Sequence, residues 1–123
     1  MEVILDTNFI ISCILKRIDF IEQLTEKGFK IVVPREAIEE LKDLKLSNKV
    51  SHEERVAINV ALELLEKKEI KRIKLGKMRV DDGLVKKGKE GVYIATLDNG
   101  IKRQVPNRVV ILDSKKEVGV ERD

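Results

Sequence analysis

Two acidic residues stand directly after apolar runs, where a buried strand would deliver them to an open edge. Asp6 follows Val3-Ile4-Leu5, and Asp98 follows the run Tyr93-Ile94-Ala95-Thr96-Leu97. In open α/β sheets, ligands bind in the crevice beyond the carboxyl ends of the strands. If these two strands are neighbours, the carboxylates of Asp6 and Asp98 face each other in that crevice.

Three further acidic residues fall where this architecture would bring them toward the same crevice. Glu40 precedes the apolar Leu41 on a predicted helix, and Asp81 and Asp82 open the helix before the second of those strands. Clustered carboxylates raise one another's pKa, so such a group persists when a cation neutralises it. Oxygen ligands without His or Cys select hard ions, Mg²⁺ or Mn²⁺ above Zn²⁺. A pair of such ions about 3.5–4 Å apart can activate water for an in-line phosphodiester displacement.

Other kinds of active site find little support. The only histidine, His52, falls in the first turn of an unrelated helix, and the only cysteine, Cys13, has the spacing of a core residue. A nucleophilic triad, a disulfide and a Cys-rich zinc site are therefore excluded, and no glycine-rich phosphate loop is present. Two structural interpretations of the acids stay open. Asp81 or Asp82 could cap a helix, and Asp98-Asn99-Gly100 has the chemistry of a hairpin turn.

Apolar periodicity predicts the elements that would position these acids. We expect strands at 3–5, 30–33, 69–75, 92–96 and 109–112, with the frayed end of the preceding helix as the alternative at 69–75. We expect helices at 10–27, 34–44, 51–65, 82–90 and 99–105. This alternation implies one domain, residues 1–113, with a parallel sheet covered on both faces. Residues 114–123 are highly charged and are expected to form a mobile tail.

The third predicted helix carries the clearest local signal. Ser51 and Glu54 have the spacing of a capping box. The predicted buried stripe of this helix consists of Val56, Val60, Ala61, Leu64 and Leu65.

Composition indicates a globular protein with an aliphatic core and a strongly charged surface. Hydrophobic residues make up 42% of the chain and charged residues 38%, a balance that also suits a heat-adapted protein. No apolar run approaches the roughly 20 residues needed to span a bilayer, and no signal peptide is recognisable. We therefore expect a cytoplasmic protein. The net charge is +3, and basic residues concentrate in the second half, including the segment 67–79, where they could contact phosphates.

Four segments of this chain resemble the sequence motifs of the PIN-domain ribonucleases. They are Ile4-Leu5-Asp6-Thr7-Asn8, the segment 33–41 that contains Glu40, Asp81-Asp82-Gly83-Leu84, and Ala95-Thr96-Leu97-Asp98. Their order and spacing match from residue 2 to about residue 112. The resemblance is greatest to the branch related to the small-subunit-processome nuclease, in an archaeal-sized form, and the VapC toxins share the motifs less closely.

The resemblance implies a three-layer α/β/α fold with a five-stranded parallel sheet and Rossmann-type crossovers. It implies a Mg²⁺- or Mn²⁺-dependent endoribonuclease that hydrolyses phosphodiester bonds of single-stranded RNA, in ribosomal RNA processing or RNA turnover. It also implies frequent homodimers, and an antitoxin partner only if the chain is VapC-like. No membrane partner is expected.

The motif positions assign roles to particular residues. The implied metal ligands and catalytic residues are Asp6, Glu40, Asp81 and Asp98, with Asp82 as the second choice for the third ligand. Asp81 is favoured because it places Leu84, rather than Val85, on the core face three residues later. Candidates to orient the carboxylates or contact substrate are Thr7, Asn8 and Thr96, and candidate RNA contacts are Arg79, Lys102 and Arg103.

Two other functional classes compete with a nuclease. The first is a non-catalytic module that binds RNA or the ribosome, although a phosphate binder gains nothing from an anionic pocket. The second is a receiver-like phosphoacceptor, which would need an acidic pair at the first strand end and an Asp after the third strand. The chain has Asp6 alone at the first position and Ile73-Lys74-Leu75-Gly76 at the other.

Overall fold

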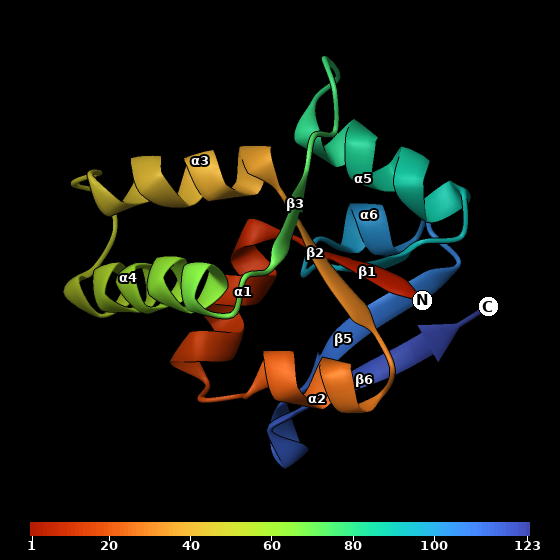
Figure 1. The fold of residues 1–123 in the computed structure, drawn as a ribbon, viewed down its shortest axis with the longest axis horizontal. Coiled ribbons are helices and arrows are strands. Elements are labelled where there is room, and N and C mark those ends of the chain that lie inside the picture. Colours follow the sequence, from red (N-terminus) through yellow and green to blue (C-terminus); the bar gives the residue numbers. More distant parts are fainter.

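The computed structural model describes residues 1–123 and shows strands and helices alternating along the chain (Figure 1). The strands are β1 (Glu2–Leu5), β2 (Lys30–Pro34), β3 (Lys71–Ile73), β4 (Tyr93–Ala95), β5 (Asn107–Leu112) and β6 (Glu117–Arg122). The helices are α1 (Thr7–Leu15), α2 (Phe20–Glu26), α3 (Arg35–Lys45), α4 (His52–Lys67), α5 (Val80–Lys89) and α6 (Asn99–Lys102), and a short 3₁₀ helix, η1, spans Asp113–Lys115.

The strands form one sheet in the order β3-β2-β1-β4-β5-β6. The first five in chain order run parallel, and β6 pairs antiparallel with β5. The predicted α/β class with a parallel sheet is confirmed, and β6 adds a sixth strand that the sequence did not predict.

Alternating side chains of the strands feed two separate cores, as the twofold period of a strand requires. Val3 and Leu5 point toward α1 to α4 and belong to a core cluster of 24 buried residues. Ile4, between them, points to the opposite face and joins a smaller cluster of 7 buried residues with Leu84 of α5 and Ile101 of α6. Figure 1 shows the two helix groups on the two sides of the strands. The fold therefore has three layers.

The strand order reverses between β1 and β4, so the switch point of the sheet lies at the carboxyl ends of these two strands. After β1 the chain adds β2 and β3 on one side, and it then crosses to place β4 on the other side of β1. Leu5 pairs with Ala95, and the amide of Asp6 donates to the Ala95 carbonyl at 2.9 Å. The expectation that these strands are neighbours is therefore confirmed.

The prediction of one helix over 10–27 is wrong, because the chain breaks between α1 and α2. Arg17 has a left-handed φ of 58°, and the carboxylate of Asp19 caps α2 by accepting from the Glu22 amide at 3.3 Å. Ile18, within the break, is still buried. Its burial preserves the helical spacing of apolar residues across a segment that is not helical.

The prediction of a mobile tail at 114–123 is also wrong, because most of this segment forms η1 and β6. Val118 is buried, and its amide donates to the side-chain oxygen of Gln23 at 2.8 Å. At the far end, Asp123 accepts from the Arg108 guanidinium at 2.8 Å. A strand with only one buried side chain among charged residues gives little periodic signal.

Helix α4 begins with the predicted capping box between Ser51 and Glu54, but its buried stripe is shifted. Val56 and Val60 are 47% and 42% exposed, and Ala57 and Ile58 are buried instead. No helix is long and apolar enough to cross a membrane.

Candidate functional site

Asp6 lies at the switch point, where β1 turns directly into α1. Its Oδ1 accepts from the Thr7 amide at 2.9 Å and so caps α1, and its Oδ2 accepts from the Thr96 hydroxyl at 2.9 Å. Thr96 is completely buried, and its oxygen accepts from the Asp98 amide at 3.1 Å. Thr96 thus connects the two predicted site acids and fixes the orientation of Asp6.

Asp98 follows β4 and caps α6. Its Oδ1 accepts from the amides of Gly100 at 2.7 Å and Ile101 at 3.2 Å. The hairpin interpretation of Asp98-Asn99-Gly100 is therefore wrong, since these residues start a helix. The capping interaction engages Oδ1 and leaves Oδ2 without a protein partner to hold it.

Glu40 is an exposed residue of α3 beside the same crevice. Burial raises the pKa of Glu40, and the Thr7 hydroxyl, which faces the Glu40 carboxylate, opposes this rise, although this buried oxygen makes no hydrogen bond of normal geometry. Thr7 therefore keeps an unused donor next to the acids. A buried hydroxyl without a partner carries a desolvation cost. A ligand that drew the Glu40 carboxylate inward, to within hydrogen-bond distance of the Thr7 hydroxyl, could remove that cost.

Asp81, rather than Asp82, is the acid of α5 whose charge contributes to the pKa shifts of the other carboxylates. Its negative charge raises the pKa of both Asp6 and Glu40. Helix α5 begins at Val80 with Arg79 as its N-cap, so both acids lie inside the first turn and neither is the cap. Leu84, three residues after Asp81, is completely buried.

Electrostatic repulsion in the crevice is visible in the pKa shifts. Burial is the main cause that raises the pKa of Asp6, and the charges of Asp81 and Asp98 raise it further against the hydrogen bonds of Thr96 and Thr7. Burial also leads the rise in the pKa of Glu40, followed by the charge of Asp6. Glu40, Asp81 and Asp98, each from a different element, thus lie within electrostatic reach of Asp6.

The four carboxylates are chemically suited to bind a hard divalent cation, but they are not positioned closely enough to hold one. All four groups are carboxylates, the ligands preferred by Mg²⁺ and Mn²⁺. However, no three acidic, His or Cys side chains are arranged closely enough to hold an ion. The free Oδ2 of Asp98 and the exposed side chains of Glu40 and Asp81 leave room for these carboxylates to turn inward.

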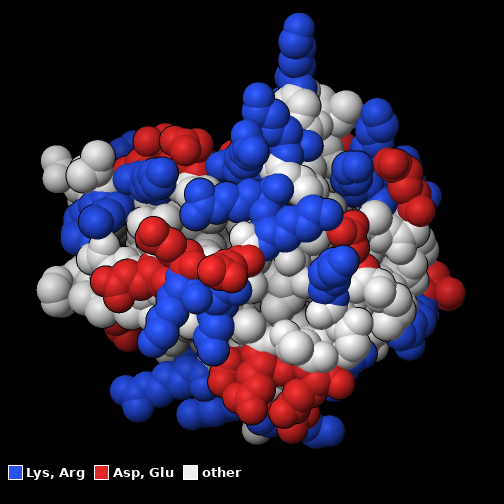
Figure 2. Space-filling model, in the orientation of Figure 1, with Lys and Arg blue, Asp and Glu red and all other residues white.

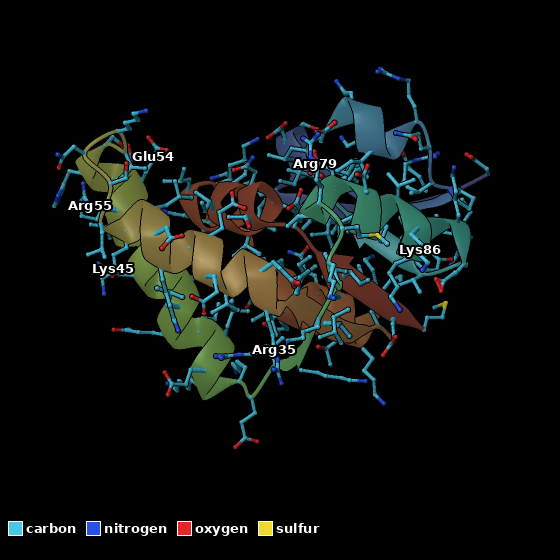
Figure 3. The ribbon with its side chains drawn as sticks, turned by 90° about the horizontal axis from the view of Figure 1, so that it is seen from above. Arg35, Lys45, Glu54, Arg55, Arg79 and Lys86 are labelled. Carbon is cyan, nitrogen blue, oxygen red and sulfur yellow. The ribbon has the colours of Figure 1, made fainter.

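Basic side chains flank the crevice on two elements. Arg79 is exposed at the start of α5, and Lys102 and Arg103 follow Asp98 at the end of α6. Figure 2 shows more Lys and Arg side chains gathered over β3 and the loop that leads to α5, and Figure 3 shows Arg79 at the start of α5. The exposed members of this group are Lys71, Arg72, Lys74 and Lys77.

The structure also reveals residues that sequence reasoning missed. The carboxylate of Glu36 accepts from the Leu75 amide at 3.2 and 3.3 Å and ties the β3–α5 loop to α3. The sequence feature that could have identified Glu36 is its position one helical turn before Glu40. A groove lined by the predicted site residues Asn8 and Asp98 was missed as well, because its apolar walls carry no motif.

Comparisons with known proteins agree with this architecture. A family model described as "PIN like domain" matches residues 3–114. A solved structure described as "Structure of the PIN domain endonuclease Utp24" superposes with a TM-score of 0.76 at 22% identity, over 99% of this chain and 92% of that one. No curated protein matches the sequence. Because the family model covers nearly the whole chain, the chain belongs to the family of PIN-like domains.

Proposed function

We propose that this chain is a Mg²⁺- or Mn²⁺-dependent endoribonuclease that hydrolyses single-stranded RNA. The observation that carries this proposal is the position of Glu40, Asp81 and Asp98 around Asp6 at the switch point: burial leads the rise in the pKa of Asp6, and the charges of Asp81 and Asp98 add to it. A cluster of like charges that is costly to the fold is expected where a cation or reaction chemistry needs it.

Each residue would have a defined task in this reaction. Asp6 would be the fixed ligand, because Thr96 and Thr7 already hold both of its oxygens in place. Glu40, Asp81 and Asp98 would complete the site directly or through water. One or two bound ions would supply activation of water and neutralisation of negative charge at the phosphodiester.

The basic side chains of Arg79, Lys102 and Arg103 would hold the RNA backbone on either side of the crevice. Contacts of this kind release counterions, so binding should weaken steeply as salt rises. Hydrolysis would leave a 5′-phosphate and a 3′-hydroxyl. From the resemblance to PIN-domain ribonucleases we also propose a role in ribosomal RNA processing or RNA turnover in the cytoplasm. The superposed PIN-domain endonuclease has the same fold.

The test is cleavage of end-labelled single-stranded RNA with Mn²⁺ or Mg²⁺. We expect Asp6→Asn and Asp98→Asn each to lower the rate by at least about a hundredfold, since even residues that only orient metal ligands cost 10- to 100-fold. Asp43→Asn, an exposed acid on α3, is the matched control and should retain full activity. The neighbouring pair Asp81→Asn and Asp82→Asn should differ, with the larger loss at Asp81.

A second readout separates binding of the ion from catalysis. Mn²⁺ should raise the Tm of the wild-type protein and of Asp43→Asn but not that of Asp6→Asn, because only a ligand that binds the folded state stabilises it. Equal cleavage by all variants would show that a contaminant acts on the RNA. A wild type that binds RNA and cleaves none over a range of sequences would favour the non-catalytic module.

A further inference from the structure

A groove of about 460 Å³ opens directly beside the acidic crevice. Asn8 and Asp98 form its wall on the side of the crevice. The rest of the surface is mostly aliphatic and is contributed by Ile11, Leu15, Leu44, Val50, Ile58 and Leu97. The groove therefore continues the candidate site into an apolar space.

The far wall of the groove is held in place by Arg55. Its guanidinium donates to the carbonyl of Lys45 and, at 2.8 Å, to that of Ser47. These bonds tie the loop between α3 and α4 to the first turn of α4, and Figure 3 shows Lys45, Glu54 and Arg55 together at this end of the molecule. Val50 lies in the same loop, so these bonds hold one side of the groove in place.

The volume and the lining fit a small, flat and largely apolar ligand. Binding sites for small molecules are typically 300–1,000 Å³, apolar, and supplied with a few polar groups that fix orientation. Because Asp98 belongs to both the groove and the crevice, a group in the groove sits next to a phosphodiester at the acids. In a single-stranded RNA, that group is a base flanking the phosphodiester.

Aromatic stacking cannot supply this recognition. Many single-strand binders hold bases on exposed aromatic rings, but all four aromatic residues of this chain are in the core. Phe9, Phe20, Phe29 and Tyr93 are between 0% and 6% exposed. An aliphatic groove is the surface that remains for burying a base next to the crevice.

We propose that this groove binds one unpaired nucleobase of the RNA and favours a base with an exocyclic amino group. The preference follows from Glu54, whose carboxylate lines the groove and accepts only. One of its oxygens takes the Ser51 amide at 3.3 Å, which leaves the other for an amino group. Carboxylates recognise the amino group of cytosine in this way. The inference rests on the proposed function, because RNA must reach the crevice for a base to enter the groove.

The test uses free nucleosides, so that neither a phosphate nor catalysis is involved. Cytidine and uridine are titrated into methyl-labelled protein without metal, and the methyl NMR signals are followed. We expect cytidine to shift the signals of Ile11, Leu44, Val50 and Leu97, and to bind roughly fivefold more tightly than uridine. Binding of uridine equal to or tighter than that of cytidine would overturn the stated preference.

A matched pair of substitutions locates the effect. Val50→Phe fills the groove and should weaken cytidine binding by about tenfold, the effect of misfitting an apolar pocket. Val60→Phe adds the same side chain on α4 at a position 42% exposed and outside the groove, and it should bind cytidine normally. Val50→Phe should also change which positions in a long RNA are cleaved, whereas Val60→Phe leaves the pattern unchanged.

The outcomes separate this inference from the proposed function. If the wild type cleaves RNA but cytidine leaves the groove signals unmoved, the inference is overturned and the nuclease stands. If cytidine binds in the groove and no RNA is cleaved, the groove stands and the nuclease is overturned. Shifts of equal size in Val50→Phe would place the base elsewhere and contradict the groove, which would then be left for a protein partner.

Discussion

At the scale of single residues, Asp6 is held by stabilising hydrogen bonds in a position that burial makes unfavourable for its charge. The Thr7 amide and the Thr96 hydroxyl bind its two oxygens, and the pKa of the carboxyl is nevertheless raised. A residue in this state binds a proton more tightly when the protein is folded than when it is unfolded. The ionised form of Asp6 therefore costs stability.

This cost predicts a pH-dependent effect of Asp6→Asn in metal-free buffer. A carboxyl whose folded pKa is raised destabilises the fold as pH rises through the ordinary value of 3.8, and the full cost is present above the folded pKa. The variant should therefore have a higher Tm than the wild type at neutral pH, and the difference should shrink toward zero below the ordinary pKa. Thermal unfolding from acidic to neutral pH measures it.

The two hydrogen-bond partners of the Asp6 carboxylate, the Thr7 amide and the Thr96 hydroxyl, can also bond to an asparagine at this position. The asparagine retains one oxygen for the Thr7 amide, and the Thr96 hydroxyl can turn to accept from the new amide group. Asp43→Asn, on the exposed face of α3, should show no such pH dependence. A lower Tm for Asp6→Asn at every pH would show that the hydrogen bonds of the carboxylate outweigh its burial.

At the scale of elements, α5 lies close against β4 and the loop between α6 and β5 because Gly88 has no side chain. A Cβ at this position would lie 2.7 Å from the Val105 Cβ, closer still to one of its methyl groups, and 3.1 Å from Ile94. The close packing of Gly88 on Val105 and Ile94 sets how near α5 lies to β4 and the adjoining loop. Helix α5 in turn carries Asp81 to the crevice. A buried glycine thus contributes to the geometry of the acids from the other end of the helix.

We predict that Gly88→Ala destabilises the protein in spite of the better helix propensity of alanine. The gain of about 1 kcal/mol in propensity is opposed by overpacking, which costs about 1–3 kcal/mol. The free energy of unfolding in urea should fall by roughly 1 kcal/mol. In the double variant Gly88→Ala/Val105→Ala, the added methyl group has space, so Gly88→Ala should cost less in that background. An equal cost in both backgrounds would contradict the contact.

The sequence was sufficient to predict elements whose signal is local or strongly periodic. Asp6 and Asp98 follow apolar runs that are buried strands, and Ser51 with Glu54 forms the expected cap. The break at Arg17 could not be predicted, because a left-handed non-glycine residue leaves no pattern and Ile18 continues the apolar spacing. The groove was not predicted either, since its walls come from α1, α3, α4 and two loops that meet only in the folded chain.

At the scale of the whole molecule, β6 covers the edge of the sheet that β5 would otherwise expose. The opposite edge, β3, has only three residues, and Lys71 and Arg72 make it charged. Short, charged edges discourage pairing with other chains, whereas a long apolar edge promotes it. Strand β5 has six residues and includes Val109, Val110 and Ile111. The C-terminal segment therefore protects the most apolar available edge.

Removal of residues 114–123 should destabilise the protein and make it associate. The free energy of unfolding should fall by at least about 2 kcal/mol, the value of burying one valine side chain such as Val118. Light scattering should rise with protein concentration as β5 edges pair. Deletion of Asp123 alone is the control, because it leaves β6 in place. A truncated protein as stable and as weakly scattering as the full chain would contradict a structural role for β6.

The strand order also determines when, during synthesis, this molecule becomes able to act. β1 is made well before its partner β4 and the acid Asp98, which follow only after β2, β3 and the helices α1 to α5. Contacts between distant segments form late because the chain between them must first be ordered. An incomplete chain still attached to the ribosome thus carries Asp6 without Asp98. The crevice comes into existence only after Asp98 has been made, so on the proposed function a shorter nascent chain lacks an acid that it needs to attack the RNA around it.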